Sequence, residues 1–125
     1  VLLEEPSYLD VACESAKRLY ECSVLRGHTT GGPGEALQCP DSESAFGLLE
    51  SLTTLWLVTR DPFWIDRARH AAHLAATWCA SYDFAFPPGS TFGRLGMRSR
   101  GSVFANAQNK HAAPGICTLA GASLL

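Results

Sequence analysis

The sequence lacks several features that define whole classes of proteins. Its five cysteines form no CxxC pair, and no apolar run approaches the roughly 20 residues that a membrane-spanning helix needs. Basic residues are not in excess, because 10 Lys and Arg stand against 12 Asp and Glu for a net charge of -2. A zinc ribbon, a thioredoxin-like motif and a membrane span are therefore excluded, and we expect neither nucleic acid nor membrane as a partner.

The cysteines are odd in number and widely spaced along the chain. They lie at Cys13, Cys22, Cys39, Cys79 and Cys117. A chain of this size with such spacing favours reduced thiols over a disulfide framework. Cys13 and Cys79 fall within predicted helices, where a free cysteine behaves as a small apolar residue.

What the sequence does contain is typical of a globular segment. Hydrophobic residues make up 46% of its 125 residues and charged residues 18%, which is enough apolar surface to fold and excludes a disordered chain. The chain starts at Val1 without an initiator Met and ends within an apolar pattern at Leu125. We expect a fragment whose partner is the missing remainder of its own domain, and nothing in the sequence indicates its localisation.

Charge is distributed unevenly between the two halves. Residues 1–66 hold eleven acids against four bases, whereas residues 67–125 hold a single acid, Asp83, against six bases. Two halves of opposite charge are expected to attract each other or to flank a polar cleft.

Apolar periodicity predicts helices and few strands. Amphipathic patterns cover residues 7–23, residues 41–58 and residues 61–78, and Ile116 begins the pattern of a fourth helix. Asp41 or Ser42 can cap the second helix, and Asp61-Pro62 supplies an N-cap followed by proline at the first helical position. The short link predicts an antiparallel hairpin and an all-α fold.

Two long segments have no helical period. Residues 26–35 are polar and rich in glycine, and residues 82–115 contain many Gly, Pro, Ser, Arg and Asn, with a short extended stretch predicted at 102–105. Loops of this length are uncommon in compact domains unless they carry function.

Three segments carry a resemblance to a known superfamily. They are LWLVTRDPFWIDRA at 55–68, GPGEALQCPDSE at 32–43 and NAQNKHAAPGICT at 106–118. The first is similar to the hairpin turn, and the others to loop signatures, of the six-hairpin α/α toroid superfamily. This superfamily includes many glycoside hydrolases and some sugar epimerases. The resemblance extends over residues 7–125, and it implies one domain that is part of an α/α toroid, built of antiparallel helical hairpins with long functional loops.

Three carboxylates near the start of the second helix are the candidate catalytic residues. Glu35, Asp41 and Glu43 lie within nine residues of one another. Glycoside hydrolysis needs one carboxyl group to donate a proton and a second to act as base or nucleophile. Helix capping and interaction with the helix dipole are the structural alternative for the same residues.

A polar cluster in the last loop supplies the candidate sugar-binding residues. It consists of Asn106, Gln108, Asn109, Lys110 and His111, to which we add Gln38 from the earlier loop and Tyr82 as an aromatic platform. Amide side chains both donate and accept hydrogen bonds, as sugar hydroxyls do. A structural network that pins the loop is the alternative. Phe86 and Phe92 are further candidates for stacking on sugar rings.

Other chemistry is less well supported by the pattern. Arg94, Arg98 and Arg100 with Lys110 suit an acidic sugar such as a uronate, and solvated side chains are the alternative. His70 and His73 have a spacing that can bind a metal, but no third ligand accompanies them. Cys117 at a helix start is a conceivable thiolate, and core burial is the alternative. We expect no metal and no cofactor.

These features predict a carbohydrate-active enzyme, most simply a glycoside hydrolase that acts on a carbohydrate substrate with Asp41 or Glu43 as acid or base. A non-catalytic sugar-binding module or helical scaffold is the first alternative. A sugar epimerase or isomerase that relies on His111 is the second.

Overall fold

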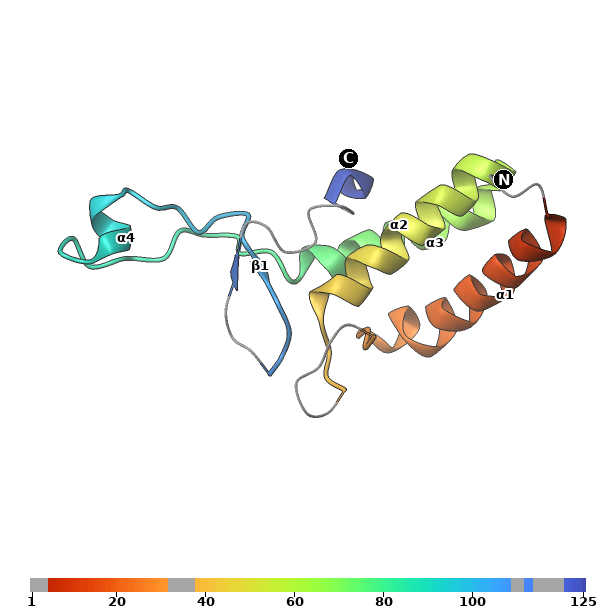
Figure 1. The fold of residues 1–125 in the computed structure, drawn as a ribbon, viewed down its shortest axis with the longest axis horizontal. Coiled ribbons are helices and arrows are strands. Elements are labelled where there is room, and N and C mark those ends of the chain that lie inside the picture. The colour runs from red at the N-terminus through yellow and green to blue at the C-terminus, as the bar shows by residue number, and fades with distance from the viewer. Residues whose placement is uncertain (1–4, 32–37, 109–111, 114–120) are drawn as a thin grey trace.

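The computed structural model describes residues 5–31, 38–108, 112–113 and 121–125. Among these residues helices predominate, and the all-α prediction is confirmed. Figure 1 shows three long helices gathered at one end of the molecule and a slender projection at the other. No helix in the described part of the chain is both long enough and apolar enough to span a membrane.

The first helix, α1, runs from Pro6 to Cys22. The Glu5 carboxylate accepts a hydrogen bond from the backbone N–H of Ser7, and proline occupies the first helical position, where its missing N–H costs nothing. A short 3₁₀ turn, η1 (Val24–Arg26), follows and ends at Gly27, whose φ of 77° is readily adopted by glycine. The helix predicted over residues 7–23 is confirmed within one residue.

The next two helices, α2 (Ser42–Thr59) and α3 (Pro62–Ala76), form the predicted hairpin. Asp41 caps α2, and Asp61 caps α3 ahead of proline at the first position. The link turns at Arg60, which has a φ of 58° and donates its backbone N–H to the Trp56 carbonyl at 2.8 Å. A left-handed residue at this position closes a helix end. The chain leaves the helix slightly earlier than predicted, with a turn at residues 77–78.

The core lies between α2 and α3, with α1 against one side. Leu49, Leu52 and Ala75 are at most 1% exposed, and Trp64 is also buried. The other two tryptophans, Trp56 and Trp78, are half-buried against this core. The remaining buried members of this core cluster are Ala16, Tyr20, Val24, Ala45, Phe46, Leu48, Leu55, Ala68, Ala71 and Val103.

The cysteines of the described part are free thiols, as predicted. Cys13 and Cys79 are half-buried against the core, and burial raises the pKa of both thiols. A raised pKa keeps a thiol protonated and unreactive, which fits a packing role. Cys117 lies outside the described residues.

A polar and aromatic contact ties α1 to α3. The hydroxyl of the buried Tyr20 is hydrogen-bonded to Nδ1 of His70, and the two rings stack with centroids 6.0 Å apart. The guanidinium of Arg67 lies over the Tyr20 ring at 5.1 Å from its centroid. These contacts orient α1 where apolar packing is sparse.

The non-helical region contains two short strands. Strand β1 (Val103–Phe104) pairs antiparallel with β2 (Ala112–Ala113), and Val103 lies opposite Ala113. The predicted extended stretch at 102–105 is thus confirmed. The predicted fourth helix begins among residues outside the described ones, and the following residues form a 3₁₀ turn, η2 (Gly121–Leu124).

Residues 82–100 form the projection, here called the arm, and the four-residue helix α4 (Thr91–Arg94) lies at its tip (Figure 1). Sequence patterns did not predict α4. Its N-cap is Ser90, whose hydroxyl accepts from the Gly93 backbone N–H at 3.0 Å. Gly93 is needed here because a Cβ at this position would lie 2.2 Å from the Pro87 carbonyl oxygen.

Candidate functional site

Three chain segments meet at the start of α2, in a region here called the junction (residues 29–31, 40–44 and 105–107). The backbone N–H of Ser42 and its hydroxyl both donate to the Ala105 carbonyl at 3.0 Å. The Ala107 N–H donates to the Pro40 carbonyl at 2.9 Å, and Asp41 forms an antiparallel bridge with Asn106. Since an antiparallel hairpin places the start of α2 beside the end of α3, the segment after the arm can reach both.

The same segment is also bound to the end of α3. The Ala80 N–H donates to the Ser102 carbonyl and the Phe104 N–H donates to the Trp78 carbonyl, at 2.8 and 2.9 Å. The junction is therefore held by backbone bonds on two sides, which gives it a defined geometry.

Asp41 is the best-anchored carboxylate of the predicted site. It is 4% exposed, and its Oδ1 accepts from the Ser44 N–H at 2.7 Å. Its Oδ2 accepts from the Ser44 hydroxyl at 2.9 Å and from the Gly31 N–H at 3.0 Å. The carboxylate thus caps α2 and holds the preceding loop at once. Capping is the role that the geometry shows for Asp41, and its catalytic role stays a prediction.

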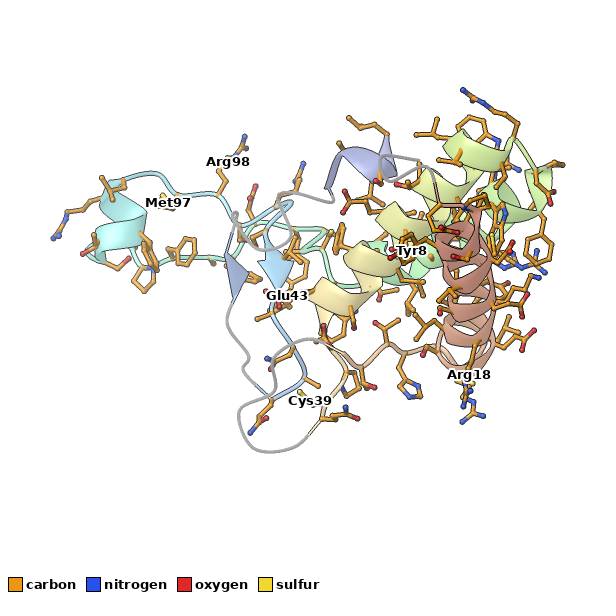
Figure 2. The ribbon with its side chains drawn as sticks, turned by 45° about the vertical axis from the view of Figure 1, so that its right-hand side comes forward. Tyr8, Arg18, Cys39, Glu43, Met97 and Arg98 are labelled. Carbon is orange, nitrogen blue, oxygen red and sulfur yellow. The ribbon has the colours of Figure 1, made fainter. Side chains whose placement is uncertain are left out.

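Glu43 lies in the first turn of α2 with its side chain exposed. Figure 2 shows it at the end of α2 that faces the β1 strand. Within the described ranges no group forms a hydrogen bond or ion pair with its carboxylate. Glu43 thus differs from Asp41, because its carboxylate remains accessible to a ligand.

The structure places only part of the predicted sugar-binding cluster. Asn106 is buried at the junction beside Asp41, and Gln38 and Gln108 are exposed on the segments that flank this bridge. The structure thus brings Asp41 and Asn106 together, and a shared ligand site there stays a prediction. Glu35, Asn109, Lys110 and His111 lie outside the described residues.

A groove of about 760 Å³ extends from the junction between α1 and α2. Thr29, Thr30, Gly31 and Ser44 belong to both the junction and the groove wall. Glu50 is the one carboxylate among the residues that line the groove. Small and hydroxyl-bearing residues predominate in the rest of the wall, which consists of Ala12, Ser15, Ala16, Leu19, Ser23, Gly47, Leu48, Ser51, Thr54 and Leu55. The volume lies within the range of about 300–1,000 Å³ typical of ligand sites.

Sequence reasoning missed Glu50. Glu43 and Glu50 are seven residues apart, so they lie on nearly the same face of α2 with about 10 Å of rise between them. Gly47 lies between the two and leaves that face open, since a Cβ there would meet nothing within 4 Å. The sequence contains the spacing Glu-x₃-Gly-x₂-Glu, but this spacing points to a site only once the structure shows that Gly47 and Glu50 line a groove.

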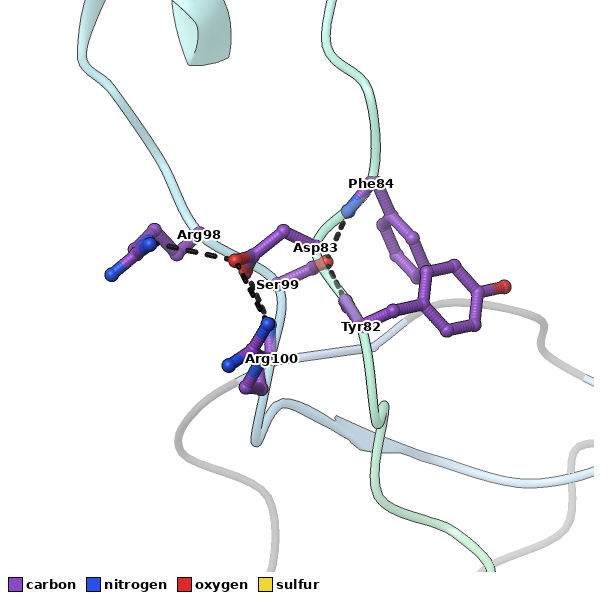
Figure 3. A network of polar contacts seen from close by, with 6 residues as sticks. All are labelled: Tyr82, Asp83, Phe84, Arg98, Ser99 and Arg100. Atoms are coloured by element: carbon purple, nitrogen blue, oxygen red, sulfur yellow. Dashed lines mark hydrogen bonds and ion pairs between the residues drawn. The ribbon is translucent and has the colours of Figure 1, made fainter.

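Tyr82 is at the base of the arm and is 63% exposed. Its carbonyl accepts a hydrogen bond from the Ser99 hydroxyl, and its ring meets that of Phe84 edge-on at 5.5 Å (Figure 3). These contacts of Tyr82 lie within the arm rather than at the junction. Its assignment to the sugar site therefore stays a prediction.

Within the described ranges, no three His, Cys, Asp or Glu residues are grouped so that they can hold a metal ion. His70 is engaged with Tyr20 through Nδ1. The chemistry that the junction and groove offer is that of carboxylates, hydroxyls and amides.

No protein family, curated protein or solved structure matches this chain.

Proposed function

We propose that this chain is part of a carbohydrate-active enzyme, a glycoside hydrolase, whose helical hairpins belong to an α/α toroid. The observation that carries the proposal is the groove of about 760 Å³ that opens at the junction, whose largely apolar wall also contains seven hydroxyl-bearing residues and one carboxylate. A sugar presents alternating hydroxyl and C–H surfaces, and small hydroxyl-bearing residues complement both.

In this proposal Glu43 and Glu50 are the two carboxyl groups. One donates a proton to the leaving glycosidic oxygen, and the other acts as the base that activates water. The rise of about 10 Å between them is compatible with the roughly 6.5–9.5 Å that separates the carboxyl groups of inverting glycosidases, because both side chains are flexible. Asp41 is then a positioning residue that holds the first turn of α2, and hence Glu43, in place.

Amide groups beside the junction orient the sugar. Gln38 and Gln108 are exposed on the two segments that the Asp41–Asn106 bridge joins. Each amide offers a donor and an acceptor to neighbouring sugar hydroxyls. The remainder of the domain closes the toroid and completes the walls of the site.

The experiment is a hydrolysis screen on a panel of neutral and acidic oligosaccharides with the natural full-length protein. Glu43→Gln and Glu50→Gln are each expected to lower kcat by about 100-fold or more, because general acid–base catalysis contributes about 10²–10⁴-fold. Glu14→Gln is the matched control, since Glu14 is an exposed helical carboxylate paired with Lys17 on α1. Full activity in both variants would show that the carboxylate assignment is wrong.

A non-catalytic sugar-binding module is the second candidate. The observation that favours it is the full engagement of Asp41 in capping and loop anchoring. In that case the natural protein binds oligosaccharides and hydrolyses none of the panel. Substitution of Gln38 or Gln108 by Ala then weakens binding, whereas Glu43→Gln leaves it unchanged.

A further inference from the structure

The arm contains a hollow that the proposed catalytic site does not use. Its volume is about 370 Å³, and its apolar wall is formed by Phe84, Phe86, Phe92 and Met97. The rings of Phe86 and Phe92 meet edge-on at 5.2 Å, and Phe92 is 54% exposed. Aromatic side chains that are held together yet open to solvent provide a surface for the C–H face of a sugar ring.

The rim of this hollow carries charge. Asp83 and Arg98 belong to its lining, and Figure 3 shows that the Asp83 carboxylate faces both Arg98 and Arg100. Nε of Arg98 is 3.5 Å and Nη2 of Arg100 is 3.9 Å from the same Oδ2. The Asp83 carboxylate is thus ion-paired with two guanidinium groups.

Arg98 is the guanidinium available to a ligand. Its side chain is 81% exposed, and Figure 2 shows it beside Met97 on the arm, away from the helical body. If Arg98 turns from Asp83, that carboxylate keeps both the Arg100 guanidinium and the Arg100 N–H, which donates to Oδ1 at 3.0 Å. Releasing Arg98 therefore leaves Asp83 paired.

A further positive charge lies at the tip. Arg94 of α4 donates to the Gly89 carbonyl and the Thr91 hydroxyl, which are neutral acceptors. The arm therefore carries three arginines against one aspartate in a chain whose net charge is -2. This excess attracts anionic ligands.

We propose that the arm is a subsite for an acidic sugar, a uronate unit of an oligosaccharide, whose ring stacks in the phenylalanine hollow and whose carboxylate binds Arg98. This inference rests on the proposed action on carbohydrates and specifies the substrate class. Arginine binds a carboxylate with two parallel N–H donors, which gives both strength and orientation. Phenylalanine rings beside one charged edge fit a sugar ring that carries a single carboxylate.

Calorimetric titration of the full chain at low salt tests the subsite. The ligands are tetramers of galacturonate, mannuronate and guluronate, with galactose and mannose tetramers as neutral counterparts. We expect at least one uronate tetramer to bind ten-fold or more tightly than the neutral ones. Arg98→Ala should weaken that binding about ten-fold, and Phe92→Ala should weaken it as well. Arg69→Ala is the control, because Arg69 is an exposed arginine of α3 paired with Asp66.

Three results of such titrations would overturn the subsite. They are equal binding of acidic and neutral tetramers, unchanged binding in Arg98→Ala, and polyaspartate binding as tight as that of the uronates. Capture by phosphatidylserine vesicles without uronate binding would also reject it and assign the arm to a lipid surface. Titration of the Glu43→Gln, Glu50→Gln double variant with the same tetramers separates this proposal from the catalytic one. Uronate binding that persists there and is lost in Arg98→Ala supports the arm, whereas binding lost in the double variant would place the ligand in the groove and reject the arm.

Discussion

The helical body and the arm are stabilised by different interactions. In the body, α1, α2 and α3 bury a continuous apolar core in which Leu49 and Leu52 are at most 1% exposed. In residues 82–100, Ser99 alone is buried, and it is a polar residue. Its hydroxyl accepts from the Phe84 N–H at 2.7 Å and donates to the Tyr82 carbonyl at 2.9 Å (Figure 3).

We therefore expect the body to determine the stability of the whole chain and the arm to determine only its own conformation. Removal of apolar area from the body changes the free energy of unfolding of the whole chain. The arm depends on a few hydrogen bonds, ring contacts and one glycine, so changes there alter its conformation and leave the body folded. The predictions below test this division, in decreasing order of expected effect.

The largest effect is expected in the core of the body. Leu52→Ala leaves a cavity at a fully buried position and should lower the free energy of unfolding by about 3 kcal/mol. Leu95→Ala, in the arm, removes the same atoms from a side chain that is 69% exposed and should cost less than about 0.5 kcal/mol. Urea unfolding followed by circular dichroism compares them. Equal losses would show that the arm belongs to the same cooperative core.

The two aspartate caps of the body allow a second comparison. Asp41→Ala leaves the Gly31 and Ser44 N–H groups without their acceptor and removes a bond to the Ser44 hydroxyl, so it should cost about 2 kcal/mol. Asp61→Ala removes one bond, to the Phe63 N–H, at an exposed site and should cost about 1 kcal/mol. The same unfolding measurement applies. A larger loss for Asp61→Ala would contradict the anchoring role of the junction.

The contact between α1 and α3 is expected to contribute less. Tyr20→Phe keeps the ring and the Arg67 contact but removes the hydroxyl that bonds to His70, at a cost of about 1 kcal/mol. Amide hydrogen exchange should increase mainly in α1. Exchange that increases equally in all three helices would mean that α1 is not a separable part of the body.

One substitution should change the conformation of the arm tip and leave the body unchanged. Gly93→Ala forces a Cβ to within 2.2 Å of the Pro87 carbonyl oxygen, so the tip has to rearrange. Gly89→Ala is the matched control, because its Cβ meets nothing within 4 Å. We expect NMR shift changes in residues 84–97 for Gly93→Ala, with the unfolding midpoint unchanged. Shifts throughout α2 and α3 would refute the separation.

The smallest expected effect is the pH response of the arm. The Arg100 N–H, together with the Arg98 and Arg100 charges, holds the pKa of Asp83 below its ordinary 3.8. A lowered folded-state pKa stabilises the arm above the ordinary value, and this stabilisation is lost as pH falls through the folded-state pKa. An acid protease should therefore cleave the arm faster below about pH 3.8. Asp83→Asn should abolish this dependence of the cleavage rate on pH.

Local patterns accounted for most of the helical body. The Asp61-Pro62 pair and the apolar spacing around it predicted the start of α3, and Asp41 was one of two caps predicted for α2. The arm was predicted only as part of a segment without helical periodicity. Its helix α4 has four residues, which is too short for a periodic signal, and it depends on the fit of Gly93 against Pro87.

For the candidate site, the sequence indicated residue types rather than partners. It placed Asp41 and Asn106 in separate motifs, and the fold joins them across 65 positions. It did not indicate Glu50 as a candidate, because Glu50 lies in the middle of a helix and only the packing of α1 beside α2 places it in the wall of the groove. Sequence order does not reveal such pairs, since they depend on how helices pack.

The sequence by itself determined where the helices of the body begin, that α2 and α3 form a hairpin and that the four cysteines of the described part are thiols. Capping, proline position and apolar period act within one or two helical turns, so neighbouring residues are enough to specify them. Only the tertiary structure decided that Asp41 is enclosed while Glu43 remains open, and that Arg98 shares its carboxylate with Arg100. Those properties depend on burial and on contacts between distant segments, which exist only once the chain has folded.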